Sequence, residues 1–81
     1  MSFVYVLVVD GAEWEDLVVY LTKAEAIEKS KQWPNTRVEI FAKSTKGGFR
    51  PTYSYYLAGV YVKSGMPCED GLDLTGLDDV V

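Results

Sequence analysis

The run from Phe3 to Val9 constrains the fold more than any other stretch of this sequence. All seven residues are β-branched, aromatic or aliphatic, which is typical of a central β-strand. The run is too short for a membrane helix, which needs about 20 apolar residues, and no basic segment precedes it as in a signal peptide. Because alternate residues of a strand face opposite sides of its sheet, this strand is apolar on both faces. Strands of this kind are usually covered on both sides.

Downstream of this strand the sequence predicts a second strand and one helix. Leu17–Leu21 is apolar and follows a turn at Asp10-Gly11, so we expect it to pair with the first strand as a hairpin. Thr22 can cap a helix, and Glu25 completes a capping box. Pro34 ends this helix after about ten residues, because the residue before a proline avoids helical angles. The residues expected to cover the sheet are Ala24, Ile27 and Trp33.

Three further strands complete the predicted domain, at residues 37–43, 52–57 and 60–63, with turns at 44–48 and 58–59. Alternation separates Val38, Ile40 and Ala42 from Arg37, Glu39, Phe41 and Lys43, and it places Tyr53, Tyr55 and Leu57 on one face. The order ββαβββ predicts the α+β class, with a mainly antiparallel sheet of about five strands and one helix on one face.

The charges divide the chain at Lys63. All eight basic residues and seven of the twelve acidic residues lie in residues 1–63, whereas residues 64–81 carry five acidic residues and no basic one. We interpret residues 1–63 as a single domain and residues 64–81 as an acidic C-terminal tail. A chain of 81 residues is too short for two domains. It buries only about 60–65% of the surface of its unfolded form, so its stability is marginal.

One face of the predicted sheet lacks a cover. A single short helix shields one face, so the side of Val4, Val6 and Val8 stays open unless the tail or a second copy of the chain lies over it. Cys68 is the only cysteine and there is no histidine, so we expect neither an internal disulfide nor a zinc site. Small domains often gain core by association, and we therefore favour a homodimer. The candidate interface residues are Val4, Val6, Val8, Trp14, Leu72, Leu74 and Leu77.

The sequence predicts no catalytic, cofactor-binding or metal-binding residue. Without histidine a histidine-based triad is excluded, and the acidic neighbours of Cys68 disfavour a reactive thiolate. The four acids of residues 10–16 lack the spacing of a calcium loop, and a solvated acidic turn is the favoured interpretation. Trp14 lies among these acids. It either folds back onto the core, which we favour, or serves as a binding anchor.

Two features bear on anionic ligands. The segment Lys43–Arg50 is basic and glycine-rich, so it could hold an anion, form a simple turn, or receive an acidic tail. The tyrosines of the last two strands could form a stacking platform for single-stranded nucleic acid; they are Tyr53, Tyr55, Tyr56 and Tyr61. The net charge of −4 argues against nucleic-acid binding, and packing between strands is the favoured interpretation.

Several stretches are distinctive in combination. They are Trp14-Glu15-Asp16, the helix start at residues 22–26, the strand at residues 37–41, and Pro51-Thr-Tyr-Ser-Tyr-Tyr56 followed by Gly59. Together, over about residues 3–63, the chain resembles small proteins of no established activity from large DNA viruses of amoebae, of the marseillevirus kind. The resemblance implies a viral protein made in the host cytoplasm and leaves open its packaging in the virus particle. It implies no functional residue.

From these observations we predict a non-enzymatic interaction protein that forms a homodimer and binds a host or viral protein through its sheet face and acidic tail. The alternative is an acidic decoy that imitates nucleic acid and occupies a nucleic-acid-binding host protein. Neither prediction involves a cofactor or a membrane, and direct binding of nucleic acid is not expected.

Overall fold

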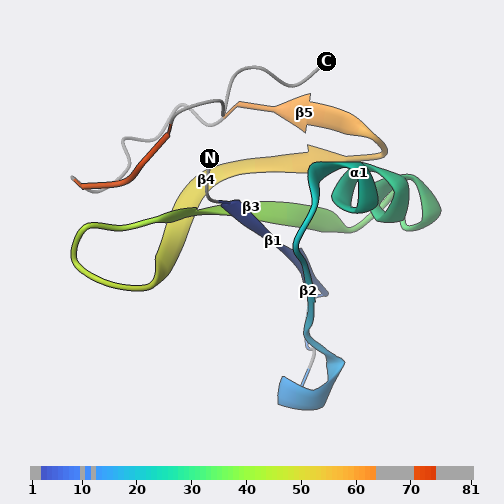
Figure 1. The fold of residues 1–81 in the computed structure, drawn as a ribbon. Coiled ribbons are helices and arrows are strands. Elements are labelled where there is room, and N and C mark those ends of the chain that lie inside the picture. The colour runs from blue at the N-terminus through green and yellow to red at the C-terminus, as the bar shows by residue number, and fades with distance from the viewer. Residues whose placement is uncertain (1–2, 10, 12, 64–70, 75–81) are drawn as a thin grey trace.

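The fold is seen in a computed structural model of the chain, which describes residues 3–9, 11, 13–63 and 71–74 (Figure 1). These residues form five strands, one α-helix and one turn of 3-10 helix. The elements in chain order are β1 (Phe3–Val8), η1 (Trp14–Asp16), β2 (Val18–Tyr20), α1 (Lys23–Gln32), β3 (Arg37–Lys43), β4 (Phe49–Leu57) and β5 (Val60–Val62). The predicted order ββαβββ is confirmed, and η1 is an addition to it.

The strands form one antiparallel sheet in the order β2-β1-β3-β4-β5. β1 pairs with β2 on one side and with β3 on the other, so the predicted hairpin of the first two strands is confirmed. The helix α1 carries the chain from β2, at the edge, across β1 to β3 (Figure 1). β4 begins at Phe49 rather than at the predicted Thr52, because Phe49 already pairs with Lys43 after the turn.

The helix α1 begins and ends as its sequence indicates, but of the three side chains predicted to cover the sheet only Ile27 packs on the core. The Thr22 hydroxyl accepts a hydrogen bond from the Glu25 N–H at 3.2 Å, which is the predicted cap. Ala26 is fully buried in α1, whereas the predicted contacts of Ala24 and Trp33 are wrong, since both side chains are exposed. Trp33 is the C-cap and has left helical angles, so its side chain no longer follows the buried stripe.

A polar contact fixes this orientation of α1. Ser30, one turn after Ala26, is fully buried, and its hydroxyl donates a hydrogen bond to the Ile27 carbonyl at 2.7 Å. The same hydroxyl accepts a hydrogen bond from the Gly59 N–H at 2.9 Å, in the turn between β4 and β5. Gly59 has a φ of 83°, a conformation that residues with a Cβ adopt only with strain. The helix is therefore tied to the far end of the sheet by one serine.

The core lies between α1 and one face of the sheet. Its buried side chains are Tyr5, Leu7, Tyr20, Ala26, Val38, Ile40 and Tyr56. Tyr56 is 1% exposed and stacks at tilted angles on Tyr5 and Tyr61, with ring centroids 6.1 and 6.0 Å away. Burial, with these two rings nearby, raises the pKa of Tyr56. Within the described part of the chain the Tyr56 hydroxyl has no hydrogen-bond partner.

A bulge interrupts the pairing of β3 with β4. Between the pairs Glu39–Tyr55 and Phe41–Pro51, β3 advances by two residues and β4 by four, so β4 carries extra residues that bend it. Tyr53 lies in this bulge with a φ of 67°. Because the bulge adds an even number of residues, burial still alternates along β4: Thr52, Ser54 and Tyr56 are buried, whereas Tyr53, Tyr55 and Leu57 are more exposed, in agreement with the predicted shared face.

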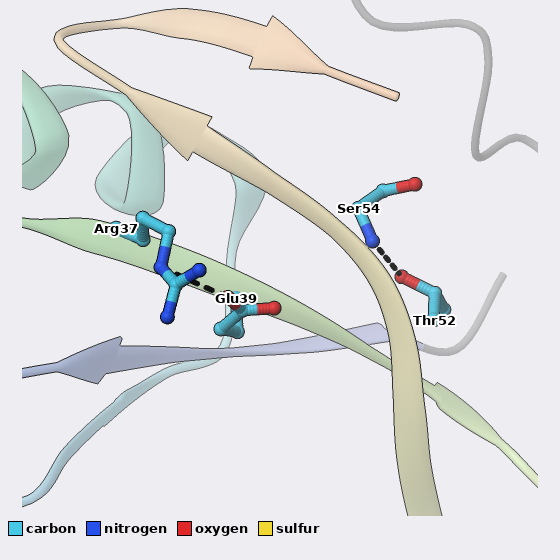
Figure 2. Close-up of polar contacts among 4 residues, drawn as sticks. All are labelled: Arg37, Glu39, Thr52 and Ser54. Atoms are coloured by element: carbon cyan, nitrogen blue, oxygen red, sulfur yellow. Dashed lines mark hydrogen bonds and ion pairs between the residues drawn. The ribbon is translucent and has the colours of Figure 1, made fainter. Parts of the chain in front are cut away.

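The side chain of Thr52 replaces the backbone hydrogen bonds that the bulge removes. Its hydroxyl donates to the Ile40 carbonyl at 2.8 Å. The same hydroxyl accepts from the Ser54 N–H at 3.2 Å, as Figure 2 shows. Thr52 is buried, so neither backbone group could turn to water instead.

We expect Thr52→Val to lower the free energy of unfolding by about 2–4 kcal/mol, because it removes the buried hydroxyl that bonds both the Ile40 carbonyl and the Ser54 N–H. Urea denaturation measures this change. Thr36→Val, the same substitution in a half-buried loop, is the control and should change stability by less than about 0.5 kcal/mol. Equal losses in the two variants would contradict this account of the bulge.

Tyr56→Phe should raise the free energy of unfolding by about 1 kcal/mol, because it removes a buried hydroxyl that makes no hydrogen bond and keeps the ring. Thermal or urea unfolding tests this expectation. Tyr5→Phe is the matched change at the neighbouring ring and should give no gain. A clear loss of stability in Tyr56→Phe would show that the hydroxyl has a partner.

Candidate interaction surface

The face of the sheet opposite α1 has no described element over it. We call it the open face. A row of paired residues crosses all five strands on it, and the neighbouring pairs extend the surface on both sides of this row. The row is Val19, Val6, Glu39, Tyr55 and Val62, and the extending residues are Val4, Val8, Arg37 and Phe41.

Burial distinguishes the two faces of the sheet. On the side of α1, alternate residues of β1 and β3 such as Leu7 and Ile40 are buried. On the open face Val4, Val6 and Phe41 are only half-buried, although they lie in the middle strands of the sheet. The residues that the sequence assigned to the two faces of the first strand therefore lie as predicted. Among the described residues, the open face is shielded only by its own side chains.

Charged and aromatic groups meet at the centre of the open face. The Arg37 Nε lies 3.3 Å from the Glu39 Oε2 (Figure 2). The Arg37 guanidinium lies over the Tyr55 ring, 5.5 Å from its centroid. The Glu39 side chain is 16% exposed and that of Arg37 is 50% exposed. Burial raises the pKa of Glu39, and the positive charge of Arg37 opposes this shift.

Sequence analysis placed Arg37 and Glu39 on one face but did not select them as site residues. The missing information was the pairing of β1 with β3, which sets Val6 beside Glu39 and Val8 beside Arg37. A charged pair at alternate positions of a predicted central strand is the signal that could have found them.

The candidate interface residues occupy three separate places. Val4, Val6 and Val8 share the open face. Trp14 lies on η1, beyond the β2 end of the sheet, and is 86% exposed, so the prediction that it folds onto the core is wrong. Leu72 pairs with the buried Ser44, which follows Ala42 on the side of α1, so Leu72 belongs to the opposite face. Leu74 is exposed, and Leu77 lies outside the described residues.

The described part of the tail pairs with the end of β3. The Thr45 N–H donates to the Gly71 carbonyl, and the Asp73 N–H donates to the Lys43 carbonyl, both at 2.9 Å. The basic segment Lys43–Arg50 thus forms hydrogen bonds with part of the acidic tail of its own chain. The N–H groups of Lys46 and Gly47 donate to the hydroxyl and the carbonyl of Ser44, so these two backbone amides already have partners within the turn.

The other candidate sites do not assemble. Tyr55 lies on the open face, whereas Tyr56 and its paired residue Tyr61 lie on the side of α1, so these tyrosines form no single platform. Among the described residues no group of three or more Asp, Glu, Cys or His side chains is placed to hold a metal ion. Cys68 lies outside these residues.

Comparisons with protein-family models, with curated proteins and with solved structures found no match to this chain. The resemblance to viral proteins over residues 3–63 therefore stays a prediction, as do the viral origin and the location in the host cytoplasm. Within the described residues, α1 is too short and too polar to cross a membrane.

Glu39→Gln should remove a pH dependence of stability. Since the folded pKa of Glu39 is raised, its contribution is fully present below the unfolded pKa and is lost as the pH rises through the folded pKa. Wild type should therefore lose stability relative to Glu39→Gln between about pH 4 and pH 7. Urea denaturation across this range measures the difference.

Glu28→Gln, the same change of charge at an exposed position of α1, is the control and should keep the pH dependence that Glu39 confers. A difference between wild type and Glu39→Gln that stays constant, or that shrinks as the pH rises, would contradict the assigned environment of Glu39.

Proposed function

We propose that this chain is a non-enzymatic interaction protein that self-associates and binds a protein partner through the open face of its sheet. The observation that carries the proposal is the half-burial of Val4, Val6 and Phe41 in the middle of a sheet whose other face is sealed. Apolar side chains grouped in this way on a sheet face are typical of interaction surfaces.

The centre of the open face has the composition of an interaction hot spot. Arginine and tyrosine are enriched among the residues that contribute most to binding, and here Arg37 and Tyr55 lie against each other at the surface. Glu39 also pairs with the guanidinium, so the group is positioned before a partner arrives. A partner with an aromatic ring or a carboxylate suits the exposed side of Arg37.

The proposal that the tail contributes to partner binding has narrower support. The described residues Gly71–Leu74 are anchored by backbone hydrogen bonds to the end of β3, and Leu74 is exposed beyond this anchor. The alternative function, an acidic decoy for a nucleic-acid-binding protein, stays a prediction, because four of the five tail acids lie outside the described residues.

Val6→Lys should reduce capture of a partner at least about 10-fold, because it sets a charge in the centre of the apolar row. The measurement is affinity capture from a lysate of amoebae, with bound proteins quantified by mass spectrometry. Ala24→Lys, which adds the same charge to the exposed side of α1, is the matched control and should bind as wild type. Equal capture by all three baits would overturn the open face as the binding site.

A further inference from the structure

The edge strand β2 carries an unusual run of exposed apolar residues. In Leu17–Leu21 only Tyr20 is buried, and the other four side chains are between 41% and 73% exposed. β2 ends the sheet on this side, so one of its edges has backbone N–H and C=O groups without a neighbouring strand among the described residues. Proteins usually protect such an edge with a short strand, charges, proline or a bulge; β2 is short, at three residues, but no charge, proline or bulge lies within Leu17–Leu21.

The opposite edge of the same sheet is protected. β5 (Val60–Val62) has the same length as β2, but it is followed directly by Lys63. At the start of β5, Gly59 lies so close to the Lys31 side chain that an added Cβ would be 2.8 Å from it. Lysine at both ends of β5 makes this edge a poor template for another strand. The contrast between the two edges singles out β2.

We propose that β2 pairs in antiparallel fashion with β2 of a second copy of this chain, which joins two five-stranded sheets into one. The edge is self-complementary, because Leu17–Leu21 carries no charge that would meet its own copy. In a register centred on Val19, Leu17 of one copy lies opposite the partner's Leu21. This inference rests on the proposed function and supplies the geometry of its self-association.

Charges at the two ends of β2 favour the same arrangement. η1 precedes β2 and is acidic, with Glu13, Glu15 and Asp16, whereas Lys23 and the N-terminus of α1 follow β2. Antiparallel pairing brings the acidic end of one β2 beside the partner's α1 N-terminus, and the two-fold axis repeats this contact. Glu25 in the first turn of α1 opposes part of this attraction. Parallel pairing would instead set the two acidic ends together.

The geometry of this pairing determines what a partner meets. Two antiparallel edge strands are related by a two-fold axis perpendicular to the sheet, so both α1 helices lie on one side and both open faces on the other. Val19 belongs to β2 and to the open face, and the central row therefore runs through the junction from one copy into the next. Two open faces become one continuous surface.

The test is sedimentation velocity of the full chain over a range of concentrations. Wild type should be a dimer, and Val19→Lys should weaken dimerisation at least about 100-fold, because two lysines face each other at the axis in place of two valines. Val60→Lys is the matched control on the other edge, with the valines 53% and 61% exposed, and it should stay dimeric. A monomeric wild type, or a dimer that Val19→Lys leaves intact, would overturn the proposal.

Cross-linking provides a readout that does not depend on the lysine variants. In the Cys68→Ser background, Val19→Cys should form a disulfide-linked dimer on mild oxidation and Val60→Cys should not, because only the β2 strands of two copies lie side by side. Cross-linking through Val60→Cys alone would overturn the proposal.

Partner capture separates this inference from the proposed function. If Val19→Lys is monomeric and still captures the protein that Val6→Lys loses, the open face binds without the dimer. If wild type is monomeric and Val19→Lys loses a captured protein, β2 accepts a strand of another protein and the second copy is excluded as its occupant.

Discussion

A ten-residue helix has to seal one face of a five-stranded sheet, and the small residues Ala26 and Ser30 make this possible. Because neither side chain extends far, α1 lies close to the strands beneath it, where Tyr56 is almost fully excluded from water. The Ser30 hydroxyl then holds the Gly59 turn, so the contact that seals the core also fixes the β5 side of the sheet. A larger residue at either helix position would lift α1 and open the core.

The position of α1 determines which face of the sheet it leaves uncovered. α1 contacts strands β1 to β4 from one side, and η1 and β5 lie toward the two ends of the sheet (Figure 1). The bulge at Thr52 bends β4 and satisfies its own backbone groups, so the sheet curves without leaving buried polar groups unpaired there. The described part of the chain has no second α-helix, and within it the open face is covered only by its own side chains.

Local sequence patterns predicted the strands and the helix, whereas pairing between distant strands determines which residues meet on the open face. Alternation in residues 37–43 and the cap at Thr22 act between near neighbours, so the strand and the helix could be read from the sequence. The bulge at Tyr53 depends on how β4 meets β3, and the outward side of Trp33 depends on how the helix ends. The meeting of Val6 with Glu39 likewise follows from pairing between strands far apart in the chain. No local pattern contains that information.

The two exposed apolar surfaces, the open face and the β2 edge, differ in where their charged residues lie. The open face sets an ion pair, Arg37 with Glu39, within its apolar row, and a partner that cannot match these charges has to strip water from them at a cost. The β2 edge has no charged residue within its strand. Its charges lie at the two ends, in η1 and at Lys23. A surface with no charged residue inside it suits an occupant of fixed sequence and matching length. A second copy of the chain meets both conditions. A surface that contains an ion pair suits recognition of a different molecule. This difference between the two surfaces supports self-association through the β2 edge and partner binding through the open face.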